Sequence, residues 1–387
     1  MREKQVLPVV VVALTAALVA VVALWTMDRV GRGGTATVIS SGPDRVIEWK
    51  LVTTWPKGLP GLGAAPENFA RRVNEASGGR MRIKVFGAGE IVPAFEVFDA
   101  VSRGVAEAGH GAAYYWKGKI PAAVFYTAVP FGMTAQEANG WLHYGGGLEL
   151  WRELYAPFGV VPFAGGSTGV QMAGWFNTRL KSRADLQGLK MRIPGLAGEV
   201  FDAAGGSAVR IAGGEVYTSM QTGVIDAVEW VGPYNDRTLG LMEVGDYYYY
   251  PGWHEPGAML ETIVNEEALA ALPDDLQAIV RIAARATNTD MLDDFTANNS
   301  ESLQILLREF DTEVLPLPED VLDALYESSQ KAIQALVESD PMAAKIAASY
   351  FEFAEKVRTY HEISERGYLN ARDRLLPPVT LTAGSAE

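Results

Sequence analysis

Ser167 lies in a motif that could support nucleophilic catalysis. Residues 165–169 (GGSTG) match the G-x-S-x-G elbow of α/β-hydrolases, and Asp236 and His254 follow in the order those enzymes use. An elbow turns from a strand into a helix, whereas residues 170–176 (VQMAGWF) are rich in β-branched and aromatic types. We therefore interpret residues 165–169 as a flexible crossing between domains. A serine hydrolase acting through Ser167 stays the least favoured alternative.

Other catalytic motifs are missing from the sequence. It contains no P-loop, no H-E-x-x-H pair, no EF-hand loop and no dinucleotide-binding glycine motif, and its 4 histidines are far apart.

The chain of 387 residues has 33 Lys and Arg against 47 Asp and Glu, a net charge of -14, with no basic run. Such a chain lacks the positive field that nucleic acid requires, so nucleic acid is excluded as a partner.

Arg192 is a candidate for binding an anion. It lies in a short predicted strand, residues 190–194 (KMRIP), where alternation places Met191 and Ile193 on one face and Arg192 on the other. Its planar guanidinium matches a carboxylate with two parallel hydrogen bonds and stays charged at any relevant pH. A structural salt bridge is the alternative.

Two glutamates and a glutamine could join this arginine. Glu229 and Trp230 end another predicted strand, at the carboxyl end where open α/β sheets place their ligands. Glu255 follows a tyrosine-rich stretch, and Gln171 follows the glycine crossing. The two carboxylates could act as acid and base, or they could hold a cation as hard oxygen ligands. A bound cation would also explain how they tolerate a partly buried cleft.

The elements that must position these residues alternate between strand and helix from residue 46 onward. Residues 47–53, 66–77 and 81–86 form one β-α-β unit. Further strands are expected at residues 160–164, 170–176, 191–193, 208–211, 225–229 and 259–264. The alternation predicts an α/β fold with mostly parallel sheets. About 360 residues exceed what one core usually organises, so two domains are expected.

The C-terminal third is expected to be mostly helical from Pro273. Apolar residues recur at spacings of three and four from Met342 to Ile363, and the pattern continues to about Leu375. A helix of roughly 35 residues spans about 50 Å, so it either crosses both domains or packs against a second copy. A homodimer through this helix and an ordinary amphipathic helix both stay open.

Residues 1–27 direct export or cross a membrane. Arg2 and Lys4 precede an uncharged, largely apolar run up to Met27. The run is longer than an ordinary signal-peptide core and shorter than a typical span, so a signal anchor and a cleaved signal peptide both stay open, with the anchor favoured. The order of charges keeps the N-terminus in the cytoplasm and sends the rest outward. Residues 28–45 are a linker.

The sequence resembles the solute-binding proteins of tripartite ATP-independent periplasmic (TRAP) transporters, especially the 2-oxo acid branch. The resemblance runs from about residue 47 to about residue 373. The matching segments are residues 53–57 (TTWPK) with 60–63 (PGLG), 114–116 (YYW), 169–175 (GVQMAGW), 189–195 (LKMRIPG) and 228–230 (VEW). It implies a two-domain, periplasmic-binding-protein-like α/β fold with a hinged cleft and a long C-terminal helix.

The resemblance also implies how the domains divide the chain. Domain I would comprise residues 46–168 and 253–297. Domain II would comprise residues 169–252 and 298–376, including the long C-terminal helix, and residues 377–387 would be a tail.

The implied function is that of an extracytoplasmic receptor, not an enzyme. It would bind a small 2-oxo or 2-hydroxy monocarboxylate, such as pyruvate, and deliver it to TRAP membrane subunits from the periplasm. Arg192 matches the arginine that binds the substrate carboxylate, and Gln171, Trp230 and Tyr115 are implied at the substrate with it. The bulk of Trp230 favours a small ligand. A related extracytoplasmic sensing module without transport stays open.

The resemblance further implies a metal cation that bridges protein and ligand. Gln171, Glu229 and the carbonyl of Trp230 match the cation-binding positions, and Glu255 is the fourth candidate. The net charge of the site is −2 when two glutamates and one substrate anion are balanced by one arginine. Na⁺ would halve this charge and Ca²⁺ would cancel it. Na⁺ is favoured over Ca²⁺.

Overall fold

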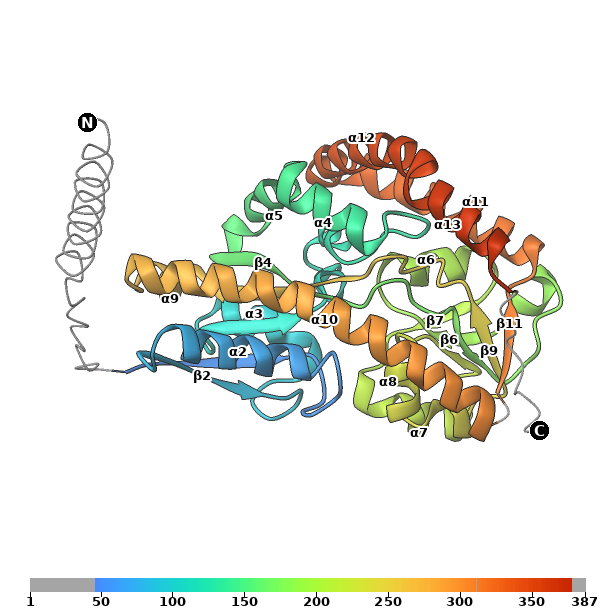
Figure 1. Cartoon of the computed structure of the whole chain (residues 1–387), viewed down its shortest axis with the longest axis horizontal. Helices are drawn as coiled ribbons and strands as arrows, with labels where there is room; N and C mark the ends of the chain where they lie inside the picture. Colours follow the sequence, from blue (N-terminus) through green and yellow to red (C-terminus); the bar gives the residue numbers. More distant parts are fainter. Residues whose placement is uncertain (1–45, 311, 378–387) are drawn as a thin grey trace, which may run out of the picture. The chain divides into compact units, whose positions relative to one another are not determined.

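The computed structural model describes residues 46–310 and 312–377 (Figure 1). The predicted signal anchor or signal peptide (1–27), the linker (28–45) and all but the first residue of the predicted tail lie outside this range. Within these residues, no helix is both long and apolar enough to cross a membrane.

The first sheet has five strands in the order β2-β1-β3-β10-β4. β2, β1 and β3 are parallel, and β10 is antiparallel to both of its neighbours. The strands are β1 (Ile47–Thr53), β2 (Met81–Phe86), β3 (Ala108–Gly111), β4 (Val160–Ser167) and β10 (Met259–Asn265). Together with α2 (Ala64–Ala76), α3 (Val97–Ser102), η3 (Ala113–Trp116), η4 (Pro121–Tyr126), α4 (Ala135–Tyr144) and α5 (Gly147–Tyr155), this sheet forms what we call the first lobe.

The second sheet has six strands in the order β11-β9-β5-β8-β6-β7, and β5 is its antiparallel member. The strands are β5 (Gly174–Phe176), β6 (Lys190–Arg192), β7 (Ser207–Val209), β8 (Ala227–Val228), β9 (Tyr247–Tyr250) and β11 (Glu313–Pro316). With α6 (Gly195–Ala203) and α7 (Val216–Gln221) it forms the second lobe. The chain changes sheet after β4, after β9 and after α10. The predicted α/β fold is confirmed, but both sheets are mixed: among the described strands, five pairs are parallel and four are antiparallel.

Helix α10 (Asp274–Glu309) is 36 residues long and connects the two lobes. It packs against α2 (Ala64–Ala76) and β4 in the first lobe, and against α8 (Pro233–Thr238) after β8 (Figure 1). Its first turn carries Asp274 and Asp275, and its last turn carries Arg308, which suits the helix dipole at both ends.

The other helices cover the sheets or connect strands. The α-helices are α3 (Val97–Ser102), α4 (Ala135–Tyr144), α5 (Gly147–Tyr155), α6 (Gly195–Ala203), α7 (Val216–Gln221), α9 (Glu266–Ala270), α11 (Glu319–Ser339), α12 (Pro341–Ile363) and α13 (Glu365–Leu375). The 3₁₀ turns are η2 (Ala94–Glu96), η3 (Ala113–Trp116), η4 (Pro121–Tyr126), η5 (Ala156–Phe158), η6 (Arg183–Leu186), η7 (Gly213–Glu215) and η8 (Leu241–Glu243).

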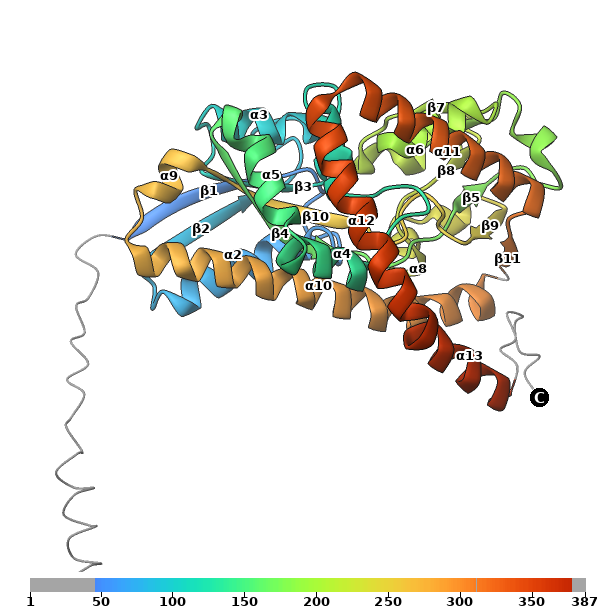
Figure 2. The ribbon, with the colours of Figure 1, turned by 90° about the horizontal axis from the view of Figure 1, so that it is seen from above.

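The predicted long C-terminal helix is present and bends once. α12 begins at Pro341, where the Asp340 side chain accepts hydrogen bonds from two backbone amides, and the helix is interrupted at Ser364 (φ -105, ψ -95) before α13. α12 packs on α4, α5 and η4 of the first lobe, while α11 packs on α6 of the second (Figure 2). The expected division placed all of 298–376 in domain II, so the contacts of α12 differ from it. The remaining domain boundaries stay a prediction.

Three strands lack the alternation of apolar and polar residues by which strands are predicted. β3 (AGHG) has small residues because Gly109 lies against the side chains of Val97, Val101 and Ile263, where an added Cβ would come within 3.0 Å of each. β9 and β11 lack a clear alternation of apolar and polar residues. The strand expected over 170–176 begins only at Gly174.

Candidate functional site

Two neighbouring parallel strands bring Arg192 and Glu229 together. Arg192 ends β6 and pairs in register with Val228 of β8, so Glu229 follows directly beyond the strand end. Nη1 of Arg192 donates to the Glu229 carbonyl at 2.7 Å and to Oε2 of Glu229 at 2.9 Å. Its Nε donates to the carbonyl of Ile211 at 3.2 Å. Both charged side chains are buried, so the pair is largely shielded from water.

The two segments that cross between the sheets supply Gln171 and Glu255. Nε2 of Gln171 donates to Oε2 of Glu255 at 2.7 Å and to Oγ1 of Thr168 at 3.0 Å. The backbone amide of Gln171 donates to the Glu255 carbonyl at 3.2 Å. The crossings are therefore tied to each other at the site.

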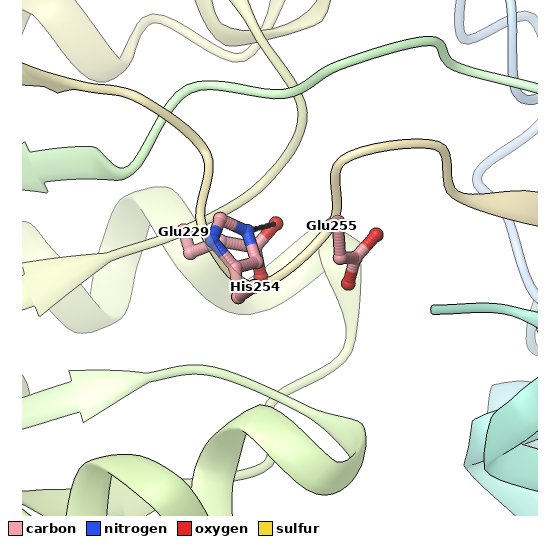
Figure 3. A group of neighbouring side chains, drawn as sticks. All are labelled: Glu229, His254 and Glu255. Atoms are coloured by element: carbon pink, nitrogen blue, oxygen red, sulfur yellow. Dashed lines mark ion pairs between the residues drawn. The ribbon is translucent and has the colours of Figure 1, made fainter. Parts of the chain in front are cut away.

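Several buried polar atoms here have no hydrogen-bond partner among the described residues. Oε1 of Glu255, Oε1 of Gln171 and Nδ1 of His254 are such atoms. Oε1 of Glu229 and Nε2 of His254 form no hydrogen bond with any described residue and lie 3.5 Å from each other. Glu229, His254 and Glu255 each offer one ligand atom, and these atoms lie within 4.8 Å of one another (Figure 3). Unpartnered carboxylate and amide oxygens are the donor set of a hard cation, so these residues fit a bound Na⁺ or Ca²⁺.

Burial shifts the pKa values of the ionisable side chains at this site away from their usual values. Burial raises the pKa of Glu229 to about 7 against the opposing charge of Arg192, and it raises the pKa of Glu255 to about 8, helped by the charge of Glu229. Burial lowers the pKa of His254 to about 4, so this imidazole is neutral at pH 7. Two carboxylates that resist ionisation gain most from a nearby cation.

Aromatic side chains enclose the polar group. Nη2 of Arg192 donates to the hydroxyl of Tyr115 at 3.3 Å, and the guanidinium lies 4.8 Å from the ring centroid of Trp230. Trp55 meets Trp230 edge to face at 6.4 Å. The cavity between them is small, about 10 Å³, and its lining comprises Trp55, Leu62, Tyr114, Tyr115, Thr168, Gln171, Arg192, Trp230, Val231, Glu255 and Leu260.

The hydrolase alternative has no catalytic triad to support it. Ser167 ends β4 without entering a helix, and its Oγ accepts a hydrogen bond from the amide of Gly169 at 3.3 Å. Asp236 accepts from Nε1 of Trp175 and from the hydroxyl of Tyr248, and is therefore not paired with His254.

Comparison with known proteins agrees with this geometry. Residues 51–340 match the family described as bacterial extracellular solute-binding protein, family 7 (DctP). The chain belongs to the DctP family. DctP proteins are TRAP solute-binding receptors that act outside the cytoplasm and are not enzymes, so the serine hydrolase is excluded and the predicted resemblance is confirmed.

Individual relatives show which ligands similar proteins bind. The chain is 41% identical over 324 residues, 84% of its own length and 88% of the relative's, to a monocarboxylate 2-oxoacid-binding periplasmic protein of Nostoc sp.. A TRAP solute-binding protein of Pseudoalteromonas atlantica, solved with sodium and pyruvate, is 39% identical with a TM-score of 0.82 over 84% of this chain and 99% of that one. One from Colwellia psychrerythraea, with calcium and pyruvate, is 39% identical with a TM-score of 0.82 over 84% and 100%.

A third solved relative is a dimer. The TRAP solute-binding protein of Bordetella bronchiseptica is 36% identical, with a TM-score of 0.83 over 85% of this chain and 98% of that one. It is described as a mixed occupancy dimer with copurified calcium and picolinate.

The structure brings the residues proposed from the sequence into one region. Arg192, Gln171, Trp230, Tyr115 and Glu255 line the cavity, and Glu229 is hydrogen-bonded to Arg192 behind it. His254 was considered in the sequence only as a member of the hydrolase triad, although its position next to Glu255 points to the same site. Thr168, Leu62 and Leu260 were not predicted as cavity residues, because residues of these types occur throughout the chain.

Proposed function

We propose that this protein is the extracytoplasmic receptor of a TRAP transporter and binds a small 2-oxo or 2-hydroxy monocarboxylate of the pyruvate type together with a cation. One observation carries the proposal: the small cavity is lined by buried Arg192 together with Gln171 and Glu255, each of which has one buried side-chain oxygen without a hydrogen-bond partner among the described residues, and Glu229 is paired with Arg192 behind it. A cation and an anion bound together would satisfy both the oxygens and the arginine.

In this proposal the substrate carboxylate is held by Arg192 and Tyr115. Nη2 of Arg192 uses one N–H for the Tyr115 hydroxyl, so its second N–H is left for the ligand. The apolar side chains of Leu62, Leu260 and Trp230 limit the other end to a short alkyl group. The name of the Nostoc relative and the pyruvate in the solved relatives support this substrate class.

Glu229, Glu255, Gln171 and the carbonyl of Trp230 would hold the cation. It supplies positive charge to the buried carboxylates and to the oxygens of the ligand. Each carboxylate already gives one oxygen to a donor, Arg192 or Gln171, and therefore has one left. Four protein oxygens and two from a 2-oxo acid make about six ligands, the low end of the Ca²⁺ range. We therefore propose Na⁺ in preference to Ca²⁺.

The proposal includes a place and partners for the protein. Residues 1–27 would stay attached and anchor the protein in the inner membrane, with the rest of the chain in the periplasm, which an intact mass of the native protein tests. The bound ligand would be delivered to TRAP membrane subunits.

We also propose a homodimer through α12 and α13. Helix α13 has no buried residue and projects from the fold (Figure 2), and Ile363 and Leu375 are 80% and 75% exposed. The dimeric Bordetella relative supports it.

A thermal-shift screen of small carboxylates tests ligand and cation together. The protein is first stripped with a chelator and then measured in Na⁺, Ca²⁺ or neither. Ligand that binds the native state raises the melting temperature with its concentration. We expect pyruvate and 2-oxobutyrate to raise it more in Na⁺ than in a potassium buffer. Equal shifts for all acids, or none in any buffer, would contradict the proposal.

A sensing module would bind the same ligand without passing it on. Uptake of labelled pyruvate by vesicles that carry the membrane subunits separates the two functions. Uptake that depends on this protein supports the receptor, and binding without uptake supports the sensor.

A further inference from the structure

The short segment η3 of the first lobe is contacted by the second lobe at three places. Nη2 of Arg192 donates to the hydroxyl of Tyr115. On the other side of the same residue, Nη1 of Arg210 donates to the backbone carbonyl of Tyr115 at 3.1 Å. The ring of Tyr114 lies so close to Gly195 that a Cβ there would be 3.0 Å from it.

Two further contacts near η3 involve charged residues outside the ligand cavity, the exposed Arg210 and the partly buried Lys117. Arg210 follows β7, and its guanidinium lies 4.3 Å from the ring centroid of Phe95 in the first lobe. Lys117, directly after η3, forms an ion pair with Glu199 of α6 in the second lobe. Since Arg210 does not line the cavity, its contacts join lobe to lobe and not protein to ligand.

We propose that Arg210 is a latch that holds the two lobes closed over the ligand and sets how long the ligand stays bound. The inference rests on the proposed function, because it assumes that the cavity is the ligand site. Arg210 is a positioning residue: it holds the carbonyl end of Tyr115 while the hydroxyl end meets Arg192. Its donor and its stack on Phe95 exist only when the lobes are together, so they stabilise the closed state alone.

The chain supplies a matched control. Arg179 is also exposed, stacks on an aromatic ring (5.9 Å from the centroid of Tyr247) and has a polar partner, Glu313, at 2.8 Å. All three residues of this control belong to the second lobe or flank its strands. Arg179→Ala therefore removes a comparable contact without touching the contact between lobes.

The first measurement is the affinity and dissociation rate of pyruvate in Na⁺, by calorimetry and stopped-flow fluorescence. We expect Arg210→Ala to raise both Kd and koff about tenfold, Arg210→Lys to recover part of the loss, and Arg179→Ala to change neither. The melting temperature without ligand is expected to stay at the wild-type value in every variant. Unchanged Kd and koff in Arg210→Ala, with wild-type binding intact, would overturn the latch.

The second measurement reports the lobes directly. The chain has no cysteine, so Ala76→Cys at the end of α2 and Ala203→Cys at the end of α6 can be spin-labelled specifically. Adding Arg210→Ala should shift the distance distribution to longer values, and adding Arg179→Ala should not. If the wild type binds no 2-oxo acid, the proposed function fails, yet the distances still decide the latch: a shift supports it and identical distributions overturn it.

Discussion

Replacing Arg192 by lysine separates charge from geometry. Arg192 is 1% exposed and makes four hydrogen bonds, to Ile211, to the carbonyl and carboxylate of Glu229, and to Tyr115. Lysine keeps the charge, but its single nitrogen cannot reach partners placed around a planar fork. We expect Arg192→Lys to keep the ion pair with Glu229 and to lose the contacts at Nε and Nη2.

The expected loss of affinity follows from those contacts. A hydrogen bond between charged groups contributes about 1.5 to 3 kcal/mol, and Arg192→Lys removes the one proposed between Nη2 and the substrate carboxylate. Together with the freed Tyr115 hydroxyl, the loss is about 3 kcal/mol, or roughly a hundredfold in Kd. The stack of the guanidinium on Trp230 disappears as well, which adds to the effect.

Calorimetry with pyruvate in Na⁺ buffer measures this change. Circular dichroism and the melting temperature establish that the variant is folded, and Arg179→Lys, at an exposed ion pair with Glu313, is the control that should bind normally. Tyr115→Phe removes only the hydroxyl and should cost less than Arg192→Lys. A folded Arg192→Lys variant with a Kd within about threefold of wild type would refute the role of the guanidinium.

Three further predictions test the site and the fold. Glu255→Gln should abolish the Na⁺ dependence of pyruvate binding, since a ligand charge is lost; a titration with Na⁺ at fixed pyruvate shows whether dependence persists. Glu261 is buried against Trp116 with its pKa raised to about 7, so this carboxyl group by itself should lower the free energy of unfolding by about 3 kcal/mol as pH rises from 4.5 to 7, and in urea titrations Glu261→Gln should show a fall smaller than that of the wild type by this amount. Gly195→Ala, at φ +70 and against Tyr114, should cost about 1 kcal/mol of stability and weaken binding; a wild-type Kd would contradict the close approach.

Much of the fold follows from local patterns in the sequence. β1 and β2 extend over the predicted residues 47–53 and 81–86, because alternation with period two reports which face of a strand is buried. β3 and β9 were not predicted, because the glycines of β3 and the four consecutive tyrosines of β9 show no alternation of polar and apolar residues. The break at Ser364 was missed because the apolar spacing continues through it, and only the backbone angles reveal it.

Residue types specify which groups are available: one arginine at a strand end, two glutamates, a glutamine and many aromatic rings. Residue types and strand ends are local properties, so they can be recognised along the chain. Which of these groups meet depends on the folded chain as a whole. Arg192 and Glu229 are 37 positions apart and Gln171 and Glu255 are 84 apart, so their contacts depend on strand order and on where the chain crosses between sheets. The same topology places His254 beside Glu229 and Arg210 against Tyr115, because burial and packing over long separations are set by the whole fold.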